Sequence, residues 1–118
     1  MNLLKILVIL LIGIYIGYNN SYRTIILDCP KTIEKIIKKL IRQTARWSTA
    51  SQQDKSPLVR VLHANYGVGY LMALKDIATP SKIEEVTNIN MQKFESEIIN
   101  QQDRATLYAG KNCPNYTK

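Results

Sequence analysis

The sequence is poor in the residues from which most catalytic and metal sites are built. It has one histidine, His63, and two cysteines, Cys29 and Cys113, too few ligands for a multi-ligand metal centre or a haem-attachment motif. It also lacks a glycine-rich phosphate loop between a strand and a helix, and a G-x-S-x-G nucleophile elbow. We therefore expect no catalytic residue, no metal ligand and no cofactor.

Acidic residues are also scarce, with nine Asp and Glu against sixteen Lys and Arg, which gives a net charge of +7. The chain has 118 residues, of which 46% are hydrophobic and 21% charged. These values are ordinary for one small globular domain and argue against a disordered or polytopic membrane protein.

The amino-terminal part is one long apolar run. Ile6 to Tyr18 contains no charge, and a helix over residues 3–22 would be about 30 Å long, the thickness of the hydrocarbon core of a bilayer. We predict a membrane anchor over 1–22. A cleaved signal peptide is the main alternative, but no A-x-A-like cleavage site follows the run. A buried core helix is a third interpretation.

Two features of the predicted anchor bear on partners and orientation. Gly13 and Gly17 form a G-x-x-x-G motif, which would let two copies pack closely unless the glycines merely face lipid. Basic residues after the anchor favour a cytoplasmic domain by the positive-inside rule, whereas N-glycosylation sequons at Asn19 and Asn115 point to the opposite side. The orientation stays open.

The rest of the chain predicts a mainly α-helical domain over 31–110, after a connector at 23–30 and before a tail at 111–118. Apolar periodicity and capping residues indicate helices over 31–47, 57–79 and 91–109, with a short helix beginning near Ser81. Polar residues 48–55 predict a linker. Such helices are expected to form a bundle of about four. Gly67 and Gly69 permit either a close helix crossing or a break.

Positive charge is concentrated in the first of these helices. Residues 23–46 carry +5, whereas residues 47–118 carry +1. One helix face holds the basic side chains, which are Lys31, Lys35, Lys38, Lys39, Arg42 and Arg46. This face fits a solvated surface, a contact with anionic lipid headgroups, or a contact with nucleic acid. Nucleic acid is the least favoured, because no aromatic residues are interleaved with the basic ones.

Four stretches carry a family resemblance. They are S-P-L-V at 56–59, L-H-A-N-Y-G at 62–67, Y-L-M-A-L-K-D-I at 70–77 and C-P-N-Y at 113–116. With them the chain resembles short, uncharacterised, membrane-anchored proteins of large DNA viruses of algae and protists. The resemblance implies a virion or infected-cell membrane and brings no activity with it.

The functional hypothesis is a single-pass membrane-anchored structural or interaction protein, with lipid as a partner, self-association through the anchor, and an unknown protein partner. The alternatives are an accessory subunit that binds nucleic acid or acidic partners and, least favoured, a small enzyme that pairs His63 with a cysteine. We expect His63 to be a hydrogen-bonded core or rim residue. In a bundle of four helices, Cys29 and Cys113 would lie on the same side and could form a disulfide bridge. In a domain that faces the cytoplasm, both would instead be free thiols. Both alternatives stay open.

Overall fold

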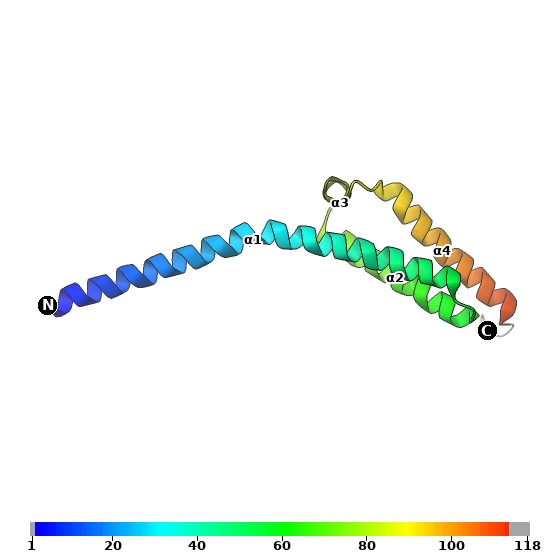
Figure 1. Ribbon diagram of the computed structural model, residues 1–118, viewed down its shortest axis with the longest axis horizontal. Helices are drawn as coiled ribbons and strands as arrows, with labels where there is room; N and C mark the ends of the chain where they lie inside the picture. Colours follow the sequence, from blue (N-terminus) through cyan, green and yellow to red (C-terminus); the bar gives the residue numbers. More distant parts are fainter. Residues whose placement is uncertain (1, 114–118) are drawn as a thin grey trace. The chain divides into compact units, whose positions relative to one another are not determined.

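The computed structural model describes residues 2–113, except for the side chains of residues 21–28. Within this part the chain forms four helices, which are α1 (Leu3–Gln53), α2 (Pro57–Ile77), α3 (Pro80–Thr87) and α4 (Met91–Asn112), and no strand (Figure 1). The expected mainly helical class and the amino-terminal apolar helix are confirmed. Contacts divide the chain between Glu34 and Lys35 into two compact units. The sequon at Asn115 and most of the predicted tail lie outside the described residues.

The predicted connector at 23–30 and the predicted linker at 48–55 are both wrong, because α1 runs through the first and continues to Gln53. Pro30 lies inside the helix. A proline there removes one backbone hydrogen bond and costs about 3 kcal/mol. Residues 23–29 contain neither glycine nor proline, so no other strong helix breaker opposes the helix.

The helix continues past residue 47 because its buried stripe continues. Ile37, Ile41, Thr44, Ser48 and Ser51 are all buried and follow one another at intervals of three or four residues. Thr44 Oγ1 donates a hydrogen bond to Leu40 O at 2.8 Å, and Ser51 Oγ donates to Ser48 O at 2.6 Å. The short side chains of Thr44 and Ser48 let α2 approach α1 closely. The linker at 48–55 was predicted because Ser48, Ser51 and their neighbours are polar.

The close approach is made at Gly67 of α2. A Cβ atom there would overlap Ser48 Oγ and would lie 3.2 Å from Ser48 N and 3.3 Å from Thr44 O. A Cβ at Gly69 would meet nothing within 4 Å. The structure therefore uses Gly67 for the helix crossing that the sequence allowed, and it gives Gly69 no such role.

Helices α2 and α4 pack against each other in opposite directions. Asn65 contacts Gln102 and Lys75 contacts Glu95, so residues later in α2 meet residues earlier in α4. A buried apolar cluster lies beyond the Asn65–Gln102 contact, toward the end of α4. It consists of Val61, Ala64, Ala105 and Ala109. The domain thus has three long helical segments, with α3 as a short fourth one.

Short local motifs set the helix ends. Ser56 caps α2 with Pro57 at the first helical position, as the sequence predicts. The capping box expected at Ser81 is not the start of α3, because Thr79 Oγ1 caps the helix at Lys82 N and Pro80 begins it. Asn88 ends α3 with a φ of 56°, a left-handed conformation that asparagine tolerates.

Candidate functional site

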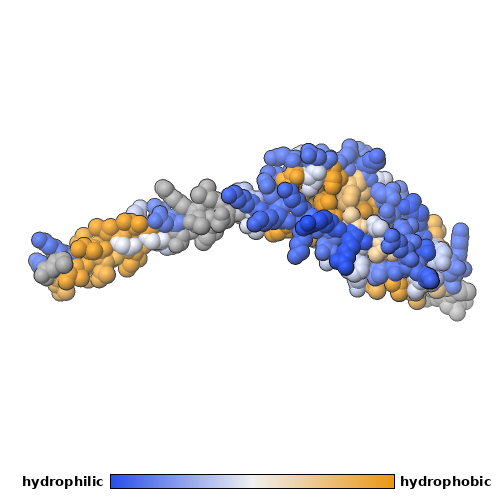
Figure 2. Space-filling model, in the orientation of Figure 1, coloured by the Kyte–Doolittle hydropathy of each residue, from blue (hydrophilic) through white to orange (hydrophobic). Residues whose placement is uncertain are grey.

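The first unit carries an apolar helix surface that is exposed. Leu3–Asn20 has a mean hydropathy of 1.7, and none of this stretch is buried. Figure 2 shows the apolar residues along this segment. The helix is long and apolar enough to cross a membrane. Gly13 and Gly17 are exposed with nothing within 4 Å of an added Cβ, so self-association through them stays a prediction.

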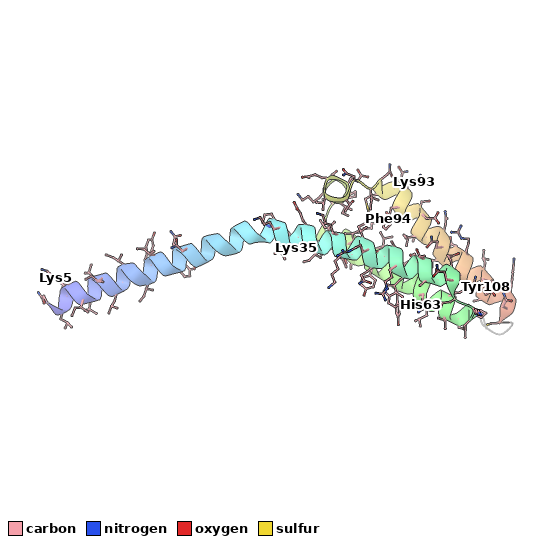
Figure 3. All side chains as sticks on the ribbon, in the orientation of Figure 1. Lys5, Lys35, His63, Lys93, Phe94 and Tyr108 are labelled. Atoms are coloured by element: carbon pink, nitrogen blue, oxygen red, sulfur yellow. The ribbon has the colours of Figure 1, made fainter. Side chains whose placement is uncertain are left out.

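All six predicted basic site residues are exposed. Lys31 belongs to the first unit, and Lys35, Lys38, Lys39, Arg42 and Arg46 belong to the second (Figure 3 labels Lys35). At 3.6 residues per turn, the five in the second unit fall within an arc of about 100°. We call these five residues the basic stripe. It lies on the side of α1 opposite the buried stripe that ends at Ser51.

The basic stripe has no compensating acid. In the described part of the chain, none of its residues is in an ion pair, whereas lysines elsewhere pair with Glu95 and Glu85. Five positive charges therefore lie along about 18 Å of helix without an internal counter-charge. An anion outside the domain is the partner that such a surface attracts.

A second surface was missed at the sequence level. The ring of Trp47 on α1 meets the ring of Tyr66 on α2 edge-on, with centroids 5.2 Å apart and planes at 79°. Beside them is an open groove of about 410 Å³, lined by Trp47, Asn65, Tyr66, Gly69, Tyr70 and Ala73. We call it the aromatic groove. The sequence showed only a broadly apolar helix at 57–79, which does not reveal which face stays uncovered.

His63 is a rim residue, as expected, and its polar partner is a carboxylate. Its Nδ1 contacts Asp54 Oδ2 just after the end of α1, with the two side chains 21% and 28% exposed. Its ring lies 4.9 Å from Trp47. Figure 3 labels His63 on α2. The Asp54 carbonyl accepts a hydrogen bond from Arg60 Nε, and the Arg60 guanidinium lies 4.1 Å from the Tyr108 ring centroid. These contacts tie the end of α1 to α2 and α4.

The sequence left Cys29 and Cys113 either bridged or free, and in the structure they are free. Cys29 is an exposed free thiol, and Cys113 is a partly exposed one that caps α4. The bridged alternative rested on an even number of helices between them. The expected four helices are present, but Cys29 lies within continuous α1 rather than in a turn before the first domain helix. Among the described residues, no group of three His, Cys, Asp or Glu could hold a metal ion.

Comparison with known proteins adds no relative: no family model, curated protein or solved structure matches this chain.

Proposed function

We propose that this is a single-pass membrane-anchored structural or interaction protein. The apolar stretch Leu3–Asn20 is the anchor, and α2, α3, α4 and the end of α1 form a small helical bundle. The basic stripe binds anionic lipid headgroups. The observation that carries the proposal is the exposed basic stripe without counter-charges on the same helix as the exposed apolar stretch. Each basic residue near an anionic surface contributes about 1 kcal/mol.

The range of this attraction constrains how it works. Electrostatic attraction is screened within about 8 Å at physiological salt. Along a helix, Lys35 follows the end of the apolar stretch by about 22 Å and Arg46 by about 39 Å. The stripe therefore reaches the headgroups only if the helix bends between them. Pro30 lies in this interval and lacks a backbone N–H, which lowers the cost of a bend.

The single tryptophan, Trp47, follows the last residue of the stripe and reports its depth. The full chain is reconstituted in phosphatidylglycerol vesicles that contain a lipid with a nitroxide on its headgroup. We expect strong quenching of Trp47 fluorescence that falls as salt rises. The variant K35Q/K38Q/K39Q should lose about 3 kcal/mol of attraction and most of the quenching. Pro30→Ala should also reduce it.

The matched control is K55Q/K93Q/K111Q, which removes the same charge from three exposed lysines outside the stripe. It should keep the quenching. Quenching that depends neither on salt nor on the stripe lysines would show that the stripe does not bind the membrane.

Two other functions are less well supported. The stripe suits an acidic protein or a nucleic acid by charge alone, but it presents no interleaved aromatic rings for bases. Salt titration of binding to single-stranded and double-stranded oligonucleotides tests that alternative. A His/Cys enzyme has little support, since the partner of His63 is Asp54 rather than a thiol. We do not propose an enzymatic activity.

We propose a virion or infected-cell membrane as the setting, on the strength of the sequence resemblance alone. Detection of the chain in purified particles, or in membranes of infected cells, tests this setting. Absence of the chain from both would refute the viral setting. The membrane anchor and the lipid contact of the basic stripe would not be affected, because separate experiments test them.

A further inference from the structure

A hollow of about 340 Å³ lies in the second unit, where α3 runs beside α1 (Figure 1). Its lining has two chemically different parts. The α1 side carries two basic side chains of the stripe, and the rest is mostly apolar. The lining consists of Lys38, Ile41, Arg42, Val86, Thr87 and Ile89. We call it the α1–α3 hollow, and its volume is within the range of small-molecule sites.

The apolar part of the hollow is held in place by the turn that ends α3. Asn88 takes the left-handed conformation that stops the helix, and Thr87 Oγ1 accepts a hydrogen bond from Ile89 N at 3.4 Å. Ile89 is thereby held at the hollow, which it lines together with Val86 and Ile41. Val86 and Ile89 are only half-buried by the chain itself. A preformed apolar surface with open space beside it suits a hydrocarbon chain.

The side-chain donors that the hollow offers to a ligand are both basic. The Thr87 hydroxyl already donates to Ile83 O at 2.7 Å. Lys38 and Arg42 form no ion pair with any residue that the structure describes, and the lining contains no acidic residue. They are four residues apart on one side of α1, about 6 Å along its axis. A polar group in the hollow therefore meets two positive charges and no negative one.

These two parts together select a ligand with an anionic head and a hydrocarbon tail. A simple anion would leave the apolar side chains uncovered, and a neutral amphiphile would leave the two charges without a partner. A phosphate monoester carries a charge of about −1.5 to −2 at neutral pH, which matches the two basic side chains, whereas a carboxylate carries only one charge. A guanidinium such as that of Arg42 also binds two phosphate oxygens at once. One chain, rather than two, suits a hollow near the lower end of the small-molecule range.

We propose that the α1–α3 hollow binds a single-chain phosphate amphiphile, a molecule with one hydrocarbon chain and one terminal phosphate monoester. The phosphate is held between Lys38 and Arg42, and the chain covers Ile41, Val86 and Ile89. Such a molecule dissolves as a monomer and reaches the hollow through water. The proposal therefore goes beyond the proposed function and does not require the basic stripe to lie on a membrane.

The test uses the full chain with isotope-labelled isoleucine methyl groups, in nanodiscs of phosphatidylcholine, and octyl phosphate as the probe. Nanodiscs avoid detergents, whose alkyl chains would compete for the hollow. We expect saturable shifts of the Ile41 and Ile89 methyl signals, and none at Ile77, an exposed isoleucine outside the hollow. Octyl phosphate should bind about tenfold more tightly than inorganic phosphate or octyltrimethylammonium, because each of these satisfies only one part of the hollow.

Two double variants separate the hollow from the basic stripe as a whole. K38Q/R42Q removes the two cations that line the hollow and should weaken octyl phosphate binding about tenfold. K35Q/R46Q is the matched control, because it removes one lysine and one arginine from the same stripe, neither of which lines the hollow. It should leave binding nearly unchanged. Val86→Ser should weaken the binding of octyl phosphate but not that of inorganic phosphate, since it alters only the apolar part.

The proposal is overturned by shifts at Ile41 and Ile89 that do not saturate, or by equal affinity for octyltrimethylammonium. It is also overturned if K35Q/R46Q weakens binding as much as K38Q/R42Q, because the effect would then belong to the charge of the whole stripe. The methyl signal of Ile98, which is buried in the same unit, reports whether each variant is folded. Failure here leaves the proposed function standing, since that is tested with anionic vesicles and without octyl phosphate.

Discussion

Gly67 of α2 packs directly against Ser48 of α1, so closely that a methyl group on Gly67 would overlap the Ser48 hydroxyl. Rotation of that hydroxyl would relieve the overlap but leave tight contacts, because Ser48 N and Thr44 O would still lie 3.2 and 3.3 Å from the new atom. The crossing of the two helices therefore depends on the absence of a side chain at position 67.

We predict that Gly67→Ala lowers the free energy of unfolding by about 1–3 kcal/mol, the usual cost of overpacking. This loss should appear although alanine is the better helix former. Chemical denaturation in maltoside, followed by circular dichroism, measures it. Gly110→Ala is the reference, since an added Cβ there would meet nothing within 4 Å, and it should be neutral or stabilising. A Gly67→Ala protein as stable as this reference would contradict the close crossing.

Two buried serines on the same helix should respond in opposite ways to alanine. Among the residues that the structure describes, Ser48 Oγ is buried with no hydrogen-bond partner, whereas Ser51 Oγ donates to Ser48 O at 2.6 Å. Removing an unsatisfied buried hydroxyl relieves a desolvation penalty, so Ser48→Ala should be neutral or stabilising by about 1 kcal/mol. Ser51→Ala should destabilise by about 0.5–1.5 kcal/mol. The same denaturation assay ranks the pair, and the reverse order would refute the assignment.

The sequence predicted most of the helical content, and the missed end of α1 has an identifiable cause. Apolar periodicity identified the helix at 31–47 because isoleucines mark its buried face. Beyond residue 47 the same face is occupied by Ser48 and Ser51. Both residues are polar, so a prediction based on hydropathy assigns them to a linker. Their spacing continues that of Ile37, Ile41 and Thr44. Periodicity of side-chain size, rather than of hydropathy, would have extended the helix to its observed end.

The position of the basic stripe could be predicted because all five residues belong to one helix. Their exposure could be predicted because charged side chains are seldom buried. The aromatic groove could not, since it needs Trp47 of one helix beside Tyr66 of another. Sequence periodicity shows that α2 is apolar over more than one side. It does not show which side α1 and α4 cover, because that is decided by the small residues at the crossings.

The pH dependence of stability should include a contribution from Glu97. Hydrogen bonds from Gln101 Nε2 and from Arg104, both at 3.0 Å, lower the pKa of this carboxyl below its ordinary value of 4.5. Because the folded-state pKa is the lower one, the stabilisation is present above pH 4.5 and is lost as pH falls through the folded-state pKa. Glu97→Gln should therefore lose less stability on acidification than the original chain does.

Thermal unfolding in a pH series tests this. Glu85→Gln is the control, because the Glu85 side chain is 70% exposed and its one ion pair, with Lys82, is 3.5 Å long. A Glu97→Gln protein with the same acid profile as the original chain would show that the two hydrogen bonds do not persist in solution.

The apolar stretch Leu3–Asn20 should stay in the membrane as an uncleaved anchor. A full-length chain with a carboxyl-terminal tag should remain in the membrane pellet after carbonate extraction, since about 27 Å of apolar helix is long enough to span the bilayer. Mass spectrometry should recover the residues before Asn19. A soluble product that begins between Asn19 and Arg23 would identify the stretch as a cleaved signal peptide.

The two cysteines should be free in the folded protein. Both are free thiols, and although Cys113 follows α4 as its C-cap, Cys29 lies within α1 rather than in a turn before the domain. A bridge between them would close a loop of 85 residues and contribute about 4–5 kcal/mol in the chain-entropy model. Its absence means that reduction should leave the melting temperature unchanged. Thiol labelling of the unreduced, denatured chain should modify two cysteines per molecule. Labelling of none, together with a melting temperature that falls on reduction, would establish the bridge instead.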